Sequence, residues 1–164
     1  MTHKIIDNFL PEDNFLSIQK GILRNLDFPW FMGNGVAYED DGHNYFVHEF
    51  YKHHAPVSEH IKILLPLLEK LDAPSLIRVK ANMYIQGKEV VEHGMHRDNA
   101  YKHNGFILYL NTCNGYTKLE DGTKVDSVEN RALFFDSYKP HCSTGCTDQL
   151  YRANININYF EAVK

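Results

Sequence analysis

His96 and Asp98 stand two residues apart in the segment His96-Arg97-Asp98, and both side chains are common metal ligands. On an extended backbone, residues i and i+2 point to the same side, so an imidazole nitrogen and a carboxylate oxygen can converge on one point. This pair is frequent by chance and needs a third ligand from a neighbouring strand. His141 fits that role, because it follows a predicted strand at 132–136 and leaves room for three or four strands after Asp98.

Two imidazoles and one carboxylate on one side of a metal form the facial triad of non-haem Fe(II) oxygenases. Such a triad fills three of six octahedral positions, which leaves two for a chelating 2-oxo acid and one for O2. Fe(II) suits a mixed nitrogen and oxygen donor set, and it can pass electrons to O2 where zinc cannot. We therefore predict that His96, Asp98 and His141 are the metal ligands and catalytic residues of an Fe(II) site.

Two other ligand sets can be drawn from the same region. His93 lies three residues before His96, but on a strand that spacing points its side chain to the opposite face. His141, Cys142 and Cys146 would suit zinc, although they lack the paired CxxC arms of a typical zinc site. Cys142 and Cys146 are instead predicted to be small buried residues, and the sequence assigns them no further role.

Arg152 supplies a candidate anchor for a co-substrate. An arginine guanidinium can bind a carboxylate through two parallel hydrogen bonds, and the distal carboxylate of 2-oxoglutarate is such a partner. Asn82, Tyr84 and Asn154 lie on the polar faces of predicted strands, and we expect them to add hydrogen bonds to the same molecule. The sequence thus predicts a 2-oxoglutarate pocket beside the metal.

Strands must bring these residues together. Polar and apolar residues alternate from Arg78 to Gln86, and again from Arg152 to Tyr159. This period of two is typical of strands with two distinct faces. The polar face of the second strand carries an arginine and three asparagines. Because asparagine is a poor strand former, a polar cavity inside a barrel explains this face better than bulk solvent does, although a solvent-facing strand stays the alternative.

The back half of the chain contains further strand signals. Strands are predicted at 105–111, 116–119 and 132–136, and turn residues separate them. Several short strands at this spacing indicate a sandwich or a jelly roll.

The front half is predicted to support this strand-rich half. A short strand is expected at 5–10, followed by an amphipathic helix over 11–26 whose apolar stripe ends at Leu26. A second helix is expected from 57 or 58 to 71, with Pro66 kinking or shortening it. The aromatic stretch 28–51 indicates strands joined by loops, which either pack on the core or face the substrate.

The composition is that of an ordinary globular domain. The 164 residues are 43% hydrophobic, which is enough to form one core. The net charge of -4 gives no electrostatic footprint for nucleic acid. No segment approaches the ~20 apolar residues that span a bilayer, and the first residues lack the apolar stretch of a signal peptide. We therefore expect no membrane association and a cytoplasmic location.

Over residues 78–160, about half of the chain, the sequence resembles the 2-oxoglutarate/Fe(II)-dependent oxygenases. It is most similar to the small prolyl-hydroxylase-like oxygenases of marine phage and bacteria. The N-x-Y and R-x-N patterns also resemble those of the nucleic-acid demethylase branch. The matching segments are Asn82-Met83-Tyr84, His96-Arg97-Asp98, the run from Gly115 to Gly122, His141, and Arg152-Ala153-Asn154-Ile155-Asn156.

This resemblance implies a mainly β fold with flanking helices, namely a double-stranded β-helix (a cupin-like jelly roll). It also implies Fe(II) held by the three ligands above, 2-oxoglutarate salt-bridged to Arg152, and ascorbate as an auxiliary reductant. The chain would form one oxygenase domain over 1–164. Within it, 1–75 would give helical support and substrate-side elements, and 78–160 would form the metal-binding core.

The implied activity is hydroxylation of a second substrate, with conversion of 2-oxoglutarate to succinate and CO2. That substrate would be a prolyl or other peptidyl side chain, or a small molecule. Two alternatives are a non-catalytic cupin-like protein that binds a metal or a small acid, and a nucleic-acid demethylase. The demethylase branch has a second arginine six residues after the first, where this chain has Asn158. That departure and the acidic net charge count against nucleic acid, while the substrate and the oligomeric state are left undetermined.

Overall fold

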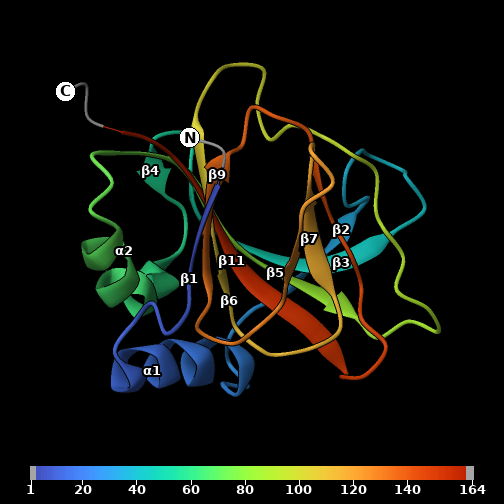
Figure 1. The fold of residues 1–164 in the computed structure, drawn as a ribbon. Coiled ribbons are helices and arrows are strands. Elements are labelled where there is room, and N and C mark those ends of the chain that lie inside the picture. The colour runs from blue at the N-terminus through green and yellow to red at the C-terminus, as the bar shows by residue number, and fades with distance from the viewer. Residues whose placement is uncertain (1–2, 162–164) are drawn as a thin grey trace.

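The computed structural model describes residues 3–161 and shows a mainly antiparallel β-structure with helices at one side (Figure 1). The helices lie in the first half: α1 at Glu12–Leu23, the 3₁₀-helix η1 at Glu59–Leu64 and α2 at Leu65–Leu71. The strands are β1 (His3–Ile6), β2 (Phe31–Asn34), β3 (Asn44–Lys52), β4 (Ala55–Pro56), β5 (Ser75–Ile85), β6 (Asn104–Tyr109), β7 (Tyr116–Leu119), β8 (Lys124–Asp126), β9 (Ala132–Asp136), β10 (His141–Ser143) and β11 (Tyr151–Phe160).

The strands form two sheets that make up a jelly roll. The larger sheet has the order β1-β9-β6-β11-β5-β3-β2, with β4 paired to β3, and the smaller sheet has the order β10-β7-β8. Segment 92–98 joins the edge of the smaller sheet through single antiparallel bridges from Glu92 to Thr144 and from His96 to His141. The predicted double-stranded β-helix is confirmed, and four strands, β6 to β9, separate Asp98 from His141.

The central strands β5 and β11 divide the molecule into an apolar layer and a polar interior. Many of their odd-numbered residues, such as Ala81, Ile155 and Ile157, are fully buried in the main core. Figure 1 shows α1 and α2 on the same side of the large sheet, and they supply Phe15, Ile18, Ile22 and Leu67 to that core. The even-numbered residues therefore point into the roll, as the alternation in the sequence predicts.

The first helix is shorter than predicted. Pro11 is its N-cap, and acidic residues in its first turn suit the positive end of the helix dipole. The helix ends at Leu23, because Asn25 begins a turn in which its side chain accepts a bond from the Asp27 amide, 3.0 Å away. Leu26 therefore lies beyond the helix and is 100% exposed, so its assignment to the buried stripe is wrong.

The second predicted helix is split in two. The segment begins as η1, capped by the Ser58 hydroxyl, which accepts from the His60 amide. Pro66 stands in the first turn of α2, where its missing N–H costs nothing. The expected shortening at Pro66 is thus confirmed.

The N-terminal strand pairs with β9 but ends at Ile6, earlier than the predicted 5–10. Leu10 is instead held by the side chain of Asn130. Its amide donates to Asn130 Oδ1 and its carbonyl accepts from Asn130 Nδ2, both at 2.9 Å. At Leu10, hydrogen bonds to this side chain take the place of hydrogen bonds to a neighbouring strand. The alternation of polar and apolar residues cannot predict such a contact.

Within residues 3–161, no helix has both the length and the apolar character required to cross a bilayer.

Candidate metal centre

His96, Asp98 and His141 meet at the mouth of the roll. The backbones of His96 and His141 bond to each other in both directions, at 2.9 and 3.0 Å. Their Nε2 atoms each lie 3.8 Å from an Asp98 carboxylate oxygen. One donor atom from each of the three residues lies within 4.8 Å of the other two. The structure thus brings together the three residues that the sequence singled out.

Both histidines present the nitrogen that a metal needs. The Nδ1 atoms of His96 and His141 each lie 3.1 Å from a backbone carbonyl oxygen, of Gly94 and Lys139 respectively. Because a carbonyl only accepts, each Nδ1 carries the proton and each Nε2 keeps its lone pair. Burial also lowers the pKa of His141, which favours its neutral form. This donor set fits a divalent metal such as Fe(II).

Three side chains hold the Asp98 carboxylate in place. Arg78 donates to its Oδ1 at 2.8 Å, and Ser137 and Asn158 donate to its Oδ2 at 2.6 and 2.8 Å. Burial would raise the pKa of Asp98, but the charge of Arg78 and the bonds around the carboxylate keep the pKa well below its ordinary value. Sequence reasoning missed Arg78 and Ser137 in this role.

Arg78 and Asn158 face each other across β5 and β11. The demethylase-like pattern has an arginine at position 158, and this chain has a guanidinium directly opposite, on the neighbouring strand. The Asp98 carboxylate, the candidate metal ligand, therefore has a cationic partner even with asparagine at position 158. The sequence did contain a sign that Arg78 faces the site, because Arg78 lies on the same polar face of β5 as Asn82 and Tyr84.

An Arg78→Met variant is expected to bind Mn(II), a stand-in for Fe(II), about 10- to 100-fold more weakly, because an orienting partner of a ligand carboxylate is lost. Anaerobic calorimetric titration measures this affinity. Arg97→Met is the matched control, because Arg97 is exposed and stacks on Tyr138 at 5.0 Å. Equal affinities in the two variants would contradict the positioning role.

Arg152 lies at the other end of β11 and is fully buried. Its guanidinium donates to the Thr144 carbonyl at 3.3 Å and to Thr117 Oγ1 at 2.9 Å, while its Nε has no partner. The rings of Tyr84 and Tyr109 flank it at 5.5 and 5.4 Å. Within residues 3–161, no carboxylate lies at ion-pair distance from Arg152. A buried cation in this state is prepared for an anionic ligand.

The other predicted co-substrate residues lie between Arg152 and the metal ligands. Asn82 and Asn154 are cross-strand partners, and Asn82 Nδ2 donates to Asn154 Oδ1 at 3.0 Å. Tyr84 pairs with Arg152 in the same register. Thr117 and Tyr109 were missed by sequence reasoning, although Thr117 lies in the motif run from Gly115 to Gly122.

One pocket connects these residues. It is lined by Val36, Lys80, Asn82, Tyr84, His96, Asp98, Ile107, Thr117, His141, Cys142, Ser143, Asn154 and Asn156. Arg152 is not among these lining residues, but Tyr84 and Thr117, which contact it, are. The polar face of β11 therefore lines a cavity, and its alternative placement toward solvent is wrong.

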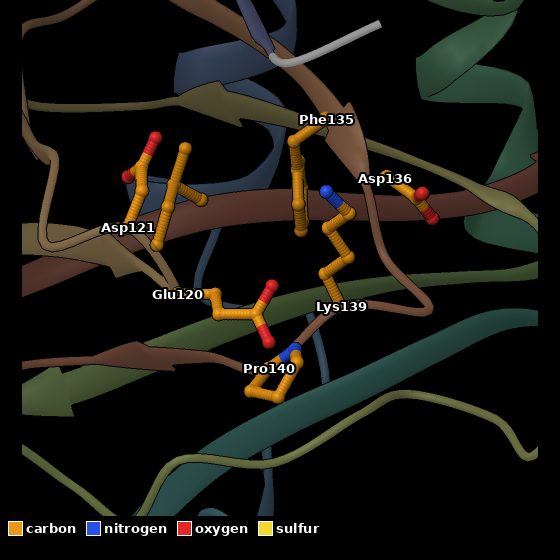
Figure 2. Close-up of a pocket in the computed structure, with 7 residues that line it drawn as sticks. Glu120, Asp121, Phe135, Asp136, Lys139 and Pro140 are labelled. Atoms are coloured by element: carbon orange, nitrogen blue, oxygen red, sulfur yellow. The ribbon is translucent and has the colours of Figure 1, made fainter.

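A separate pocket lies between the ends of β7 and β9 and the residues that precede β10 (Figure 2). It is lined by Leu119, Glu120, Asp121, Phe135, Asp136, Lys139 and Pro140 and shares no residue with the metal pocket. Phe135 separates the two, with its ring edge-on to His141 at 4.8 Å. This pocket contains none of the three candidate donors, His96, Asp98 and His141.

Loop 35–43 supplies Val36 to the metal pocket and is held by Asp41. The Asp41 carboxylate accepts backbone N–H bonds from Val36, Ala37, Tyr38 and His43 at 3.0, 2.7, 3.3 and 2.9 Å. Burial would raise the pKa of Asp41, but these four bonds lower it to about 2.

This loop is expected to loosen in acid. Because the folded pKa of about 2 is below the ordinary 3.8, the carboxylate stabilises the loop fully above pH 3.8 and stops doing so as the pH falls through about 2. At neutral pH, Asp41→Ala should speed amide hydrogen exchange at Val36 and Ala37 about tenfold. Asp40→Ala is the control, since Asp40 bonds only to the Asn34 side chain. Unchanged exchange in Asp41→Ala would refute this role.

The alternative ligand sets do not form. His93 points to Ser143 Oγ, 2.9 Å from its Nδ1, and packs on Tyr84 outside the triad. Among the described residues, the Cys146 thiol does not converge with the side chains of His141 and Cys142. It lies instead near the Cys113 thiol and the Asp148 carboxylate. Cys142 and Cys146 are buried, as predicted.

Comparison with known proteins gives similarity of fold at low sequence identity. No protein-family model matches the sequence, and no curated protein matches it. A prolyl hydroxylase from Trichoplax adhaerens, solved with a hypoxia inducible factor peptide fragment, aligns over 97% of this chain and 83% of its own, with a TM-score of 0.73 and 16% identity. The chain has the jelly-roll fold of the 2-oxoglutarate/Fe(II) oxygenases.

Two bacterial structures agree with this. An oxidoreductase of the 2OG-Fe(II) oxygenase family from Burkholderia pseudomallei aligns over 96% of this chain and 84% of its own, with a TM-score of 0.74 and 13% identity. A prolyl-4-hydroxylase from Pseudomonas putida aligns over 98% and 92%, with a TM-score of 0.66 and 14% identity. The similarity includes the helical front half as well as the strand-rich half.

Proposed function

We propose that this protein is a 2-oxoglutarate- and Fe(II)-dependent dioxygenase that hydroxylates a second substrate and releases succinate and CO2. One observation carries the proposal: the donor atoms of His96, Asp98 and His141 converge within 4.8 Å at a pocket that is also lined by Tyr84 and Thr117, the neighbours of the buried Arg152 guanidinium, which has no carboxylate partner among residues 3–161. His96, Asp98 and His141 would hold Fe(II), and Arg152 would bind the distal carboxylate of 2-oxoglutarate.

Bound Fe(II) would supply the redox chemistry with O2. The protein residues supply position and charge. The backbone carbonyls behind His96 and His141 fix the ring orientations, and Arg78 fixes Asp98. Asn82, Asn154 and Tyr84 would contact the co-substrate between the metal and Arg152. Ascorbate would serve only to keep the iron ferrous.

The second substrate is proposed to be a peptidyl side chain or a small molecule. The Trichoplax prolyl hydroxylase has a peptide bound, and the shared fold supports a peptide as one candidate. The cytoplasmic location, the single-domain organisation over 1–164 and the absence of a nucleic-acid partner stay predictions from the sequence.

Anaerobic addition of Fe(II) and 2-oxoglutarate tests the proposal directly. A weak visible charge-transfer band, followed by succinate formation when air is admitted, is the expected result. A band without succinate would indicate a non-catalytic binding protein, and the absence of both would reject the assignment. His96→Ala serves as the control, since it should show neither signal.

A further inference from the structure

Lys80 is a cation inside the metal pocket that no part of the proposed function uses. It lies on the polar face of β5, and its side chain lines the pocket together with the three proposed ligands. Its ammonium sits 5.6 Å from the centre of the Tyr45 ring. Burial lowers the pKa of Lys80 to about 7, which reflects the cost of keeping this charge without a close partner.

The charges around the pocket leave Lys80 without a carboxylate of its own. Asp98 is bound to Arg78 at 2.8 Å, and Glu49 on β3 is bound to Lys52 at 2.9 Å. Among residues 3–161, no carboxylate lies at ion-pair distance from Lys80. The distal carboxylate of 2-oxoglutarate is assigned to Arg152, which is four residues along the strands, about 13 Å away.

A hydrogen-bond acceptor without a partner lies directly opposite Lys80. Asn156 is its cross-strand neighbour on β11 and also lines the pocket. Asn156 is only 8% exposed, and its Oδ1 has no hydrogen-bond partner. A buried acceptor in this state requires a donor from a ligand or a water molecule. Lys80 and Asn156 together therefore match a ligand that has an anionic group and an N–H or O–H donor close to each other.

We propose, on the basis of the function above, that the second substrate is a free amino acid. Its carboxylate binds the Lys80 ammonium and its amino group donates to Asn156 Oδ1. A residue inside a peptide chain keeps a backbone N–H but has no free α-carboxylate, so the Lys80 contact selects a small free acid over a peptide. The carboxylate of 2-oxoglutarate that chelates the metal is the competing partner of Lys80, and the test separates the two.

The probes are the twenty standard amino acids and their C-terminal amides, added to protein that holds 2-oxoglutarate. Anaerobic calorimetry with Mn(II) in the site measures binding without turnover, and succinate formation in air with Fe(II) measures coupling. We expect at least one free amino acid to bind and to accelerate succinate formation, and its amide to bind at least about tenfold more weakly.

Substitution of Lys80 gives the decisive comparison. Lys80→Met should weaken binding of that amino acid about 30-fold or more, while the affinity for 2-oxoglutarate changes less than about twofold. Lys80→Arg should restore part of the affinity, because it keeps the cation. Lys62→Met is the control, since Lys62 is exposed on η1 outside the pocket, and its removal should affect neither ligand. Circular dichroism checks that each variant is folded.

Three results would overturn the inference while leaving the proposed function intact. They are failure of every amino acid to bind, equal binding of the amides, and a loss of 2-oxoglutarate affinity in Lys80→Met as large as the loss for the amino acid. The last would assign Lys80 to the co-substrate. Absence of 2-oxoglutarate binding in the unaltered protein would instead reject the proposed function and this inference with it.

Discussion

A His141→Ala variant is expected to lose Fe(II) binding and succinate formation to below detection. His141 is one of three donors on one side of the metal, and the remaining His96 and Asp98 cannot complete the facial set. The two remaining donors would then hold the ion only weakly. Anaerobic metal titration and a succinate assay measure the two losses.

His93→Gln is the matched comparison for His141→Ala. Both histidines are buried, at 8% and 4% exposure, but only His141 belongs to the converging group. His93→Gln should keep its metal affinity within a few-fold. The reverse pattern, with iron lost from His93→Gln and kept in His141→Ala, would overturn the ligand assignment.

An Arg152→Met variant is expected to become more stable and less able to use 2-oxoglutarate. Removing a buried cation that has no carboxylate partner should raise the free energy of unfolding by about 1 to 3 kcal/mol. The same change removes the anchor for the distal carboxylate, which should raise the concentration of 2-oxoglutarate required about 100-fold or more. Urea unfolding without ligand and a co-substrate titration measure the two effects.

Arg131→Met is the control for the effects predicted for Arg152→Met, because it removes an arginine that lies outside the pocket. Arg131 forms a surface ion pair with Asp7 at 2.6 Å, so its loss should leave the use of 2-oxoglutarate unchanged and lower stability slightly. An unchanged requirement for 2-oxoglutarate in Arg152→Met would refute the anchor. A loss of stability there would show that Thr117 and Thr144 hold Arg152 for a structural purpose.

The convergence of His96, Asp98 and His141 was predictable from sequence because it follows from simple geometry. The i, i+2 spacing in an extended segment aligns His96 with Asp98, and the jelly roll returns His141 beside them. The polar faces of β5 and β11 were predictable for the same reason. Period-two patterns report which side of a sheet a residue occupies.

The residues around the ligands could not be predicted in this way. Arg78, Ser137 and Asn158 come from three strand regions and meet at one carboxylate only because of the register between β5 and β11 and the course of the chain after β9. A sequence pattern does not contain that register. The Asn130 side chain that holds the Leu10 backbone lies 120 positions further along the chain, so the sequence could not reveal this contact either.

The reciprocal backbone bonds between His96 and His141 have a consequence for how the site is lost. The two backbone hydrogen bonds between His96 and His141 hold segment 92–98 at the edge of the small sheet. Detachment of this segment would therefore move the two imidazoles apart in one event. Binding of a metal at the proposed site would therefore be thermodynamically linked to closure of the roll, and a bound ion should oppose fraying there. The protein would lose its ion all at once and not ligand by ligand.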